Sequence, residues 1–222
     1  MHFAPQGYPW IFGLGSASLI LGLLEFRIPS LGIFFLCLFV AYFFRDPNRT
    51  PPEGQRLIVA PADGRVVTVE QPCQDPRFLP APTIRVGIFM SPLDVHVNRL
   101  SVSGRIEAVR YQPGKFRPAF AEAAAEVNEQ NAVTIRDEQG GRIALVQIAG
   151  ILARRIVCRL KGGERVEQGA RYGMIMFGSR VDVYCPPQVA LKVEVGQRVK
   201  AGETILAVYP PTSGEDGRIE TA

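Results

Sequence analysis

Two long uncharged stretches within the first 44 residues constrain the fold most strongly. Residues 3–24 carry no charged side chain, Glu25 and Arg27 interrupt the pattern, and residues 28–44 are again uncharged and include IFFLCLFVAYFF. Apolar runs of this kind are typical of membrane segments. The second run would form a helix ~25 Å long, slightly short of a ~30 Å hydrocarbon core. We therefore expect residues 1–44 to form a hydrophobic helical hairpin that anchors the chain, either as two spans or as a re-entrant pair.

The flanks of these stretches predict the orientation of the anchor. No basic segment precedes the first run and no small-residue cleavage site clearly follows it, which disfavours a secretory signal peptide. Arg45, Arg49 and Arg56 follow the second run. By the positive-inside rule they predict that the rest of the chain lies on the cytoplasmic face of the cell membrane. The alternative is an apolar hairpin buried in a soluble core, but the flanking sequence offers little to cover it.

The remainder of the chain is typical of a β protein. Residues 45–56 are rich in proline and polar residues and are expected to form a linker, which leaves residues 57–222 as the main domain. From Leu57 onward, short β-rich runs such as TIRVGIFM and GRIALVQIAG alternate with glycine and proline, a pattern that predicts an all-β barrel or sandwich. Residues 119–130 are Ala/Glu-rich with little apolar periodicity, which suggests a short surface helix or loop.

An internal repeat refines this fold class. The pattern G-x-x-V-x-x-G followed by an apolar strand begins at Gly163 and again at Gly196. Two such copies resemble the quasi-symmetric hammerhead halves of biotinyl and lipoyl carrier domains, which form a flattened barrel-sandwich. Those domains modify a lysine on an exposed hairpin, whereas here FGSRVDVYCPP lies between the copies and Lys192 lies on a strand-like run. We expect the barrel-sandwich fold without the carrier function.

Charge and cysteine content exclude several classes of function. The formal net charge is +4 with no block of basic residues, which does not indicate nucleic-acid binding and is compatible with an anionic membrane or substrate. The four cysteines show no C-x-x-C spacing, and only two histidines are present, so we expect neither a metal site nor a disulfide framework.

The sequence Gly178-Ser179 interrupts the apolar run RYGMIMFGSRVDVY. Glycine inside a strand commonly marks a bend or a close approach to the backbone. A serine at such a point can be a hydrolase nucleophile, but the G-x-S-x-G elbow and its following helix are absent. The serine can also attack the carbonyl carbon of the preceding residue, which requires a bent backbone and a base.

His96 is the candidate base because it is the only histidine outside the hydrophobic N-terminal region. An orienting carboxylate is needed in the manner of serine triads. Asp94 would share a strand face with His96, and Asp63 lies in the turn PADG, so both are candidates. The structural alternatives are a satisfied core or surface histidine and ordinary turn aspartates.

Six segments together resemble the phosphatidylserine decarboxylase proenzymes of the short bacterial and archaeal type. They occur in order through nearly all of residues 57–210 and read APADGRV, FMSPLDVHVNR, YQPGKF, NEQNAV, QIAGILARRIVC and GMIMFGSRVDVYCP.

This resemblance implies an enzyme that makes its own cofactor. In that family the serine equivalent to Ser179 attacks the preceding carbonyl, an ester forms, and β-elimination divides the chain into residues 1–178 and 179–222. The new N-terminus becomes a pyruvoyl group, which forms a Schiff base with the amine of phosphatidylserine and draws electrons from the breaking bond to the carboxylate. Loss of carbon dioxide then gives phosphatidylethanolamine. The family pattern implies a triad of Asp63, His96 and Ser179, with His96 as the base.

Two departures from the family pattern affect individual roles. Many relatives have H-x-x-H where this chain has His96 and Arg99, so either one imidazole serves both stages or another group donates the proton. Longer relatives have a hydroxyl residue after the serine, whereas this chain has Arg180. The loop containing Lys115, Phe116, Arg117 and Phe120 is a candidate contact with the lipid head group; an ordinary solvated loop is the alternative.

Other functions remain open at the level of sequence. Archaetidylserine is an alternative substrate, because head-group chemistry does not reveal the lipid backbone. A membrane-tethered, non-enzymatic barrel-sandwich adaptor would tolerate loss of Ser179, and a serine hydrolase would be acylated on it. Exposed β edges favour a homodimer, and the expected partners are the phospholipid, the bilayer and the two cleaved chains.

Overall fold

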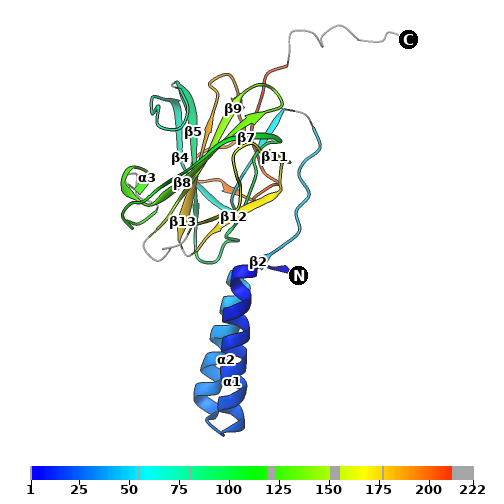
Figure 1. Ribbon diagram of the computed structural model, residues 1–222, viewed down its shortest axis with the longest axis vertical. Coiled ribbons are helices and arrows are strands. Elements are labelled where there is room, and N and C mark those ends of the chain that lie inside the picture. Colours follow the sequence, from blue (N-terminus) through cyan, green and yellow to red (C-terminus); the bar gives the residue numbers. More distant parts are fainter. Residues whose placement is uncertain are drawn as a thin grey trace, which may run out of the picture.

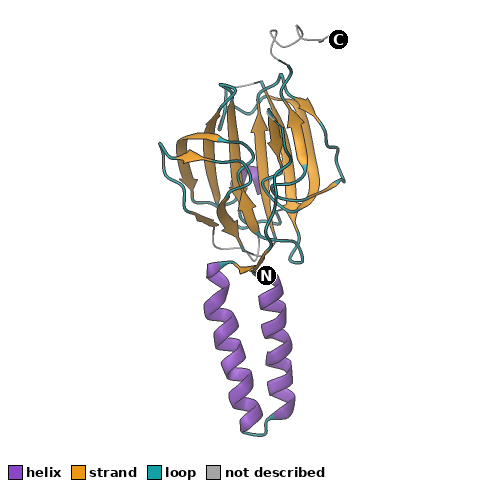
Figure 2. Cartoon of the chain, turned by 90° about the vertical axis from the view of Figure 1, so that its right-hand side faces the viewer, coloured by secondary structure: helices purple, strands orange, loops and turns teal. Residues whose placement is uncertain are grey.

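The protein consists of a β domain from which a helical hairpin projects. The computed structural model describes residues 2–54, 56–80, 82–119, 124–150, 156–176 and 178–211. The hairpin extends from one end of the β domain, and the last described residues leave the opposite end (Figures 1 and 2). The expected class, a mainly β barrel-sandwich with an N-terminal helical hairpin, is confirmed.

The two uncharged stretches form the two arms of the hairpin. A short turn η1 (Pro5–Gly7) leads into α1 (Tyr8–Leu23), and α2 (Arg27–Phe43) returns alongside it. Ser18 and Ser30 each donate a hydrogen bond to the other's backbone carbonyl, which joins the helices near the tip. Neither helix reaches the length and apolar character that a membrane crossing requires, nor does any other helix in the described part of the chain.

An eight-stranded sheet forms the main wall of the β domain. Its strand order is β11-β7-β8-β9-β13-β5-β4-β15, with antiparallel neighbours throughout. The strands are β4 (Gly64–Cys73), β5 (Thr83–Met90), β7 (Gly104–Gln112), β8 (Gln130–Asp137), β9 (Arg142–Ile148), β11 (Arg165–Val166), β13 (Ser179–Cys185) and β15 (Arg198–Val199).

Smaller sheets close the sandwich and join it to the hairpin. One has the order β10-β12-β6, a second has β14-β16-β3, and a ribbon of β1 and β2 lies where the hairpin meets the β domain. The apolar core lies between the sheets. The bounds are β1 (His2–Phe3), β2 (Arg45–Asp46), β3 (Leu57–Val59), β6 (Val97–Arg99), β10 (Ile156–Cys158), β12 (Arg171–Ile175), β14 (Ala190–Leu191), β16 (Ile205–Val208) and a short helix α3 (Ala124–Val127).

The internal repeat corresponds to two equivalent halves. β11 pairs with β7 at Gly104-Arg105, and β15 pairs with β4 at Gly64-Arg65. In each half the arginine of the longer strand donates a 3.1 Å hydrogen bond to the carbonyl of the repeat's first glycine, Gly163 or Gly196. These two glycines have φ of +89° and +93°, a left-handed conformation that explains why glycine begins both copies.

The base of the hairpin is packed onto the β domain through a second apolar cluster. Phe43 and Phe44 are buried there against Val95, Val97 and Met174. The backbone N–H of Ala4 donates to the carbonyl of Phe44. The chain that follows is also held down, because Arg49 forms a salt bridge with Asp63. The base of the hairpin is therefore packed against the β domain, and the rest of the hairpin projects away from that domain.

Candidate active site

Ser179 begins the central strand of the large sheet. β13 lies between β5 and β9, Ser179 pairs with Met90 of β5, and every residue of β13 is buried. Three residues after Met90, the carbonyl of Leu93 accepts a hydrogen bond from Arg45 at the base of the hairpin. Ser179 therefore lies at the hairpin end of the β domain.

The Gly178-Ser179 peptide approaches the backbone of the neighbouring strand closely. Gly178 has a φ of +59°, a conformation that favours glycine. Continuing the register of β9 with β13 places Gly150 opposite Gly178. A Cβ atom added at Gly150 would overlap the carbonyl oxygen of Gly178. The absence of a side chain at Gly150 thus allows the carbonyl that Ser179 would attack to lie against the extension of β9.

His96 lies in the segment that enters β6 and is fully buried. Its Nδ1 is 2.9 Å from the backbone carbonyl oxygen of Asp94, and its ring centroid is 4.2 Å from that of Phe43. Burial lowers the pKa of His96 to about 4, and the interactions with Asp94 oppose this only in part. With a proton on Nδ1, donated to the Asp94 carbonyl, Nε2 has a free lone pair and the imidazole is neutral.

Two polar atoms in this region are buried without a partner. Among the described residues, neither Nε2 of His96 nor Oγ of Ser179 has a hydrogen bond. A backbone contact brings their two segments together: the carbonyl of His96 accepts from the N–H of Ile175, four residues before Ser179. Buried polar atoms without partners are costly and are found at reactive sites. An acceptor nitrogen and a donor hydroxyl are the pair that proton transfer from the serine needs.

The two candidate carboxylates are held by other groups. Asp63 accepts hydrogen bonds from the N–H of Ala201 and from Arg49, at 2.8 and 2.9 Å. Burial raises the pKa of Asp63 despite these two interactions. The carboxylate of Asp94 accepts from the N–H and hydroxyl of Ser91. Among the described residues no side-chain carboxylate hydrogen-bonds to His96, so orientation of His96 by Asp63 stays a prediction.

Arg99, three residues after His96, contacts the chain that follows the hairpin. Its guanidinium donates to the carbonyls of Gly169 and Pro47 and forms a salt bridge with Asp46. These contacts fasten the segment after α2 to the β domain. They give Arg99 a structural role in this chain.

The candidate head-group loop is tied to the residue that precedes Gly150, which lies opposite Gly178. Lys115 is exposed and Phe116 half-buried. Asn128 bonds to the backbone of Arg117 and donates to the carbonyl of Ala149, the residue before Gly150. The sequence alone did not indicate a role for Asn128 or Gly150, although they lie in the family-like segments NEQNAV and QIAGILARRIVC. Phe120 lies outside the described residues.

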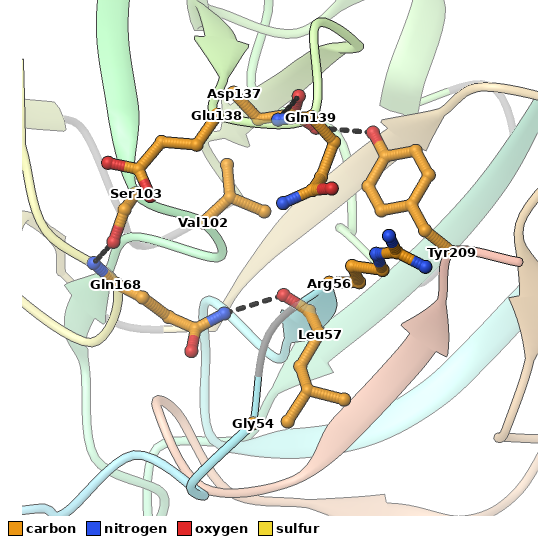
Figure 3. Close-up of a pocket in the computed structure, with 10 residues that line it drawn as sticks. All are labelled: Gly54, Arg56, Leu57, Val102, Ser103, Asp137, Glu138, Gln139, Gln168 and Tyr209. Carbon is orange, nitrogen blue, oxygen red and sulfur yellow. Dashed lines mark hydrogen bonds between the residues drawn. The ribbon is translucent and has the colours of Figure 1, made fainter. Parts of the chain in front are cut away.

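A hollow lies away from the predicted catalytic residues. It has a volume of about 400 Å³ and includes Arg56, Asp137, Gln168 and Tyr209 in its lining. Figure 3 shows Gln168 donating to the carbonyl of Leu57 and Tyr209 donating to Asp137 across this hollow. Its lining includes none of the predicted catalytic residues, so size alone does not identify the site.

The chain is similar to phosphatidylserine decarboxylases over most of its length. A family model described as phosphatidylserine decarboxylase matches residues 36–207. A phosphatidylserine decarboxylase proenzyme of Oleidesulfovibrio alaskensis is 45% identical over 203 residues, which cover 91% of this chain and 92% of the relative. The proenzyme of Geotalea uraniireducens is 41% identical over 93% of this chain and 96% of its own length. That of Salinibacter ruber is 48% identical over 82% of this chain and 81% of its own.

Proposed function

Because this chain belongs to the phosphatidylserine decarboxylase family, we propose that it cleaves itself between Gly178 and Ser179 to generate a pyruvoyl group at Ser179. Its activity is the decarboxylation of phosphatidylserine, which yields phosphatidylethanolamine and carbon dioxide. The observation that supports self-cleavage best is the buried, unpartnered hydroxyl of Ser179 next to a glycine carbonyl.

Self-cleavage would proceed by an acyl shift and an elimination, each of which needs proton transfer near Ser179. His96 Nε2 takes the Oγ proton, Oγ bonds to the carbonyl carbon of Gly178, and the C–N bond breaks as the nitrogen takes a proton. Removal of the Cα proton of residue 179 then breaks its Cβ–O bond, which frees the carboxylate of Gly178. The dehydroalanine left behind takes up water and loses ammonia to give the pyruvoyl end.

In the mature enzyme His96 is the candidate proton carrier. The pyruvoyl ketone supplies an electrophile for the substrate amine and an electron sink for the bond to the carboxylate. The role we assign to His96 is protonation of the substrate carbon after carbon dioxide leaves. Its fully buried position excludes bulk water, which protects that carbon from other proton donors. Arg99 is bound to the segment after α2, which leaves one imidazole for both stages.

The hairpin is proposed to hold the active site at the cytoplasmic surface of the cell membrane. Trp10, Phe12, Leu23 and Ile28 have 61%, 69%, 76% and 87% of their surface exposed, an arrangement that water disfavours and lipid does not. Lys115 and Phe116, in the loop tied by Asn128 to Ala149, are proposed to contact the lipid head group from the same end.

Intact-mass spectrometry of the purified protein beside its Ser179→Ala variant tests this function. We expect wild-type protein to give two fragments divided after Gly178, the smaller one with a blocked, hydrazine-reactive N-terminus. The Ser179→Ala chain should remain whole. Ser101→Ala is the matched control, because the Ser101 hydroxyl is also buried and unpartnered among the described residues. The Ser101→Ala chain should still be cleaved after Gly178. An intact wild-type chain, folded in detergent, would contradict the proposal.

A further inference from the structure

A small basic pocket lies where the hairpin meets the β domain. Its volume is about 90 Å³. Its lining includes Gln6, just before α1, and Asp46, just after α2. It also includes Arg159, which follows β10, and Arg171 and Gly173 of β12. The pocket is therefore built from both the anchor and the catalytic domain.

Aromatic residues mark the level of this pocket relative to a bilayer. Tyr8 and Trp10 in the first turn of α1 and Tyr42 in the last turn of α2 are 42%, 61% and 47% exposed. Tyrosine and tryptophan gather at membrane–water interfaces. The guanidinium of Arg45 lies 3.8 Å from the centre of the Tyr42 ring, as expected where an apolar helix end reaches charged head groups. If the hairpin enters lipid, as proposed above, the pocket lies at the level of the phosphates.

The charge of the pocket favours an anion. Asp46 forms salt bridges with both Arg99 and Arg171, at 3.3 and 2.6 Å, so its carboxylate is compensated. Arg159 is exposed, and no hydrogen bond or salt bridge involves its side chain among the described residues. Two arginines, Arg159 and Arg171, thus line the pocket with one aspartate, whose charge is also compensated by Arg99. Burial lowers the pKa of Arg99, and the positive charges of Arg171 and Arg49 lower it further.

The pocket has room for a small anionic group. Its volume of about 90 Å³ exceeds what a single bound water needs, and a phosphate group can enter it. Guanidinium groups bind phosphate oxygens through paired, charge-assisted hydrogen bonds.

We propose that this pocket binds the phosphodiester group of an anionic phospholipid, with Arg159 as its principal ligand. The inference rests on the proposed insertion of the hairpin in lipid. The phosphodiester comes either from the substrate itself or from a neighbouring anionic lipid. Both sources present the same group to Arg159, and both would hold the hairpin end of the β domain against the membrane.

Calorimetric titration of uncleavable Ser179→Ala protein in detergent measures this binding without any enzymatic step. The probes are short-chain phosphatidylglycerol, which is anionic, and short-chain phosphatidylcholine, which is zwitterionic. We expect tighter binding of the anionic lipid and about a tenfold loss when Arg159→Gln is added. Arg165→Gln is the matched control, because Arg165 is 81% exposed in its side chain and pairs with Glu138 away from the pocket. Equal affinity in the Arg159→Gln protein, with an unchanged melting temperature, would overturn the proposal.

Decarboxylation kinetics of self-cleaved protein identify the source of the phosphodiester. With short-chain phosphatidylserine below its micelle concentration, a KM raised about tenfold by Arg159→Gln assigns the pocket to the substrate. An unchanged KM, with loss of stimulation by phosphatidylglycerol in vesicles, assigns it to a neighbouring lipid. No change in either measurement would count against the pocket, while complete self-cleavage of both proteins would leave the proposed function intact.

Discussion

The imidazole of His96 makes the stability of the folded chain depend on pH. Its folded-state pKa of about 4 lies below the ordinary value of 6.5, because burial disfavours the charged ring. As pH falls below about 6.5 the unfolded chain binds a proton at His96, whereas the folded chain does so only near pH 4. The stability that His96 contributes is thus complete above pH ~6.5 and lost as pH falls towards 4.

We therefore expect acid to destabilise the chain through this residue. Between pH 7 and 5 the loss from His96 should be roughly 2 kcal/mol. Guanidinium unfolding of uncleavable Ser179→Ala protein in detergent at both pH values measures it, with a His96→Gln variant for comparison. The glutamine variant should lack this part of the pH dependence. Identical dependence in the two proteins would show that His96 titrates normally.

Gly150 is expected to position the carbonyl that is attacked. In Gly150→Ala the new Cβ would overlap the Gly178 carbonyl oxygen, so the scissile peptide must shift away from Ser179 Oγ. Self-cleavage at pH 7, followed by mass spectrometry, should slow at least tenfold, on the order of 1.4 kcal/mol or more in the barrier. Gly162→Ala is the control, since its Cβ would lie 3.7 Å from the nearest atom, the Glu107 carbonyl oxygen. Melting temperatures in the Ser179→Ala background separate slow cleavage from poor folding.

Sequence reasoning singles out candidate reactive residues more readily than the residues that would position them. Gly178, Ser179 and His96 were recognisable because their chemistry is local: a glycine–serine pair and the one histidine outside the hydrophobic N-terminal region. The role of Gly150 depends on the register between β9 and β13, which no local pattern records. Likewise, the ring contact between Phe43 and His96 joins residues 53 positions apart in the chain.

At the level of elements, the last turn of α2 contributes directly to the candidate active site. Phe43, the last residue of α2, is fully buried, and its ring packs against the ring of His96. The sequence predicted the hairpin as an anchor and the repeat as two sheet entries, since both carry regular apolar or glycine patterns. It did not predict that the base of the hairpin covers His96, because packing between separate elements leaves no periodic signal.

Phe43→Ala is expected to weaken both stability and self-cleavage. Truncation of a buried phenylalanine typically costs about 3–5 kcal/mol, so the melting temperature should fall. Water admitted beside His96 should raise its pKa from about 4 towards 6.5. As pH is lowered, the rate of self-cleavage should accordingly begin to fall at a higher pH in Phe43→Ala than in wild type. Phe39→Ala, one turn earlier at a side chain that is 41% exposed, should leave the profile unchanged; an equal shift there would argue against a specific role for Phe43.

For the whole molecule, the proposed cleavage point lies where the two products would not easily separate. Residues 179–222 supply β13, the central strand of the eight-stranded sheet, and also β14, β15 and β16, which pair with one another or with β3 and β4 of the other product. All seven residues of β13 are buried. Removing this segment would expose both neighbouring strands and open the apolar core.

We therefore expect the cleaved chains to remain together under native conditions and to depend on each other for folding. Size-exclusion chromatography in mild detergent should elute both as one species, and 6 M guanidinium should separate them. After removal of the denaturant, uncleaved Ser179→Ala protein should recover its native melting transition. Cleaved protein should not do so at low concentration, because β13 must then be recaptured from solution rather than from its own chain. Loss of the smaller product during native chromatography would contradict this, as would equal, concentration-independent refolding of the two proteins. Either result would mean that the sheet does not need its central strand after maturation.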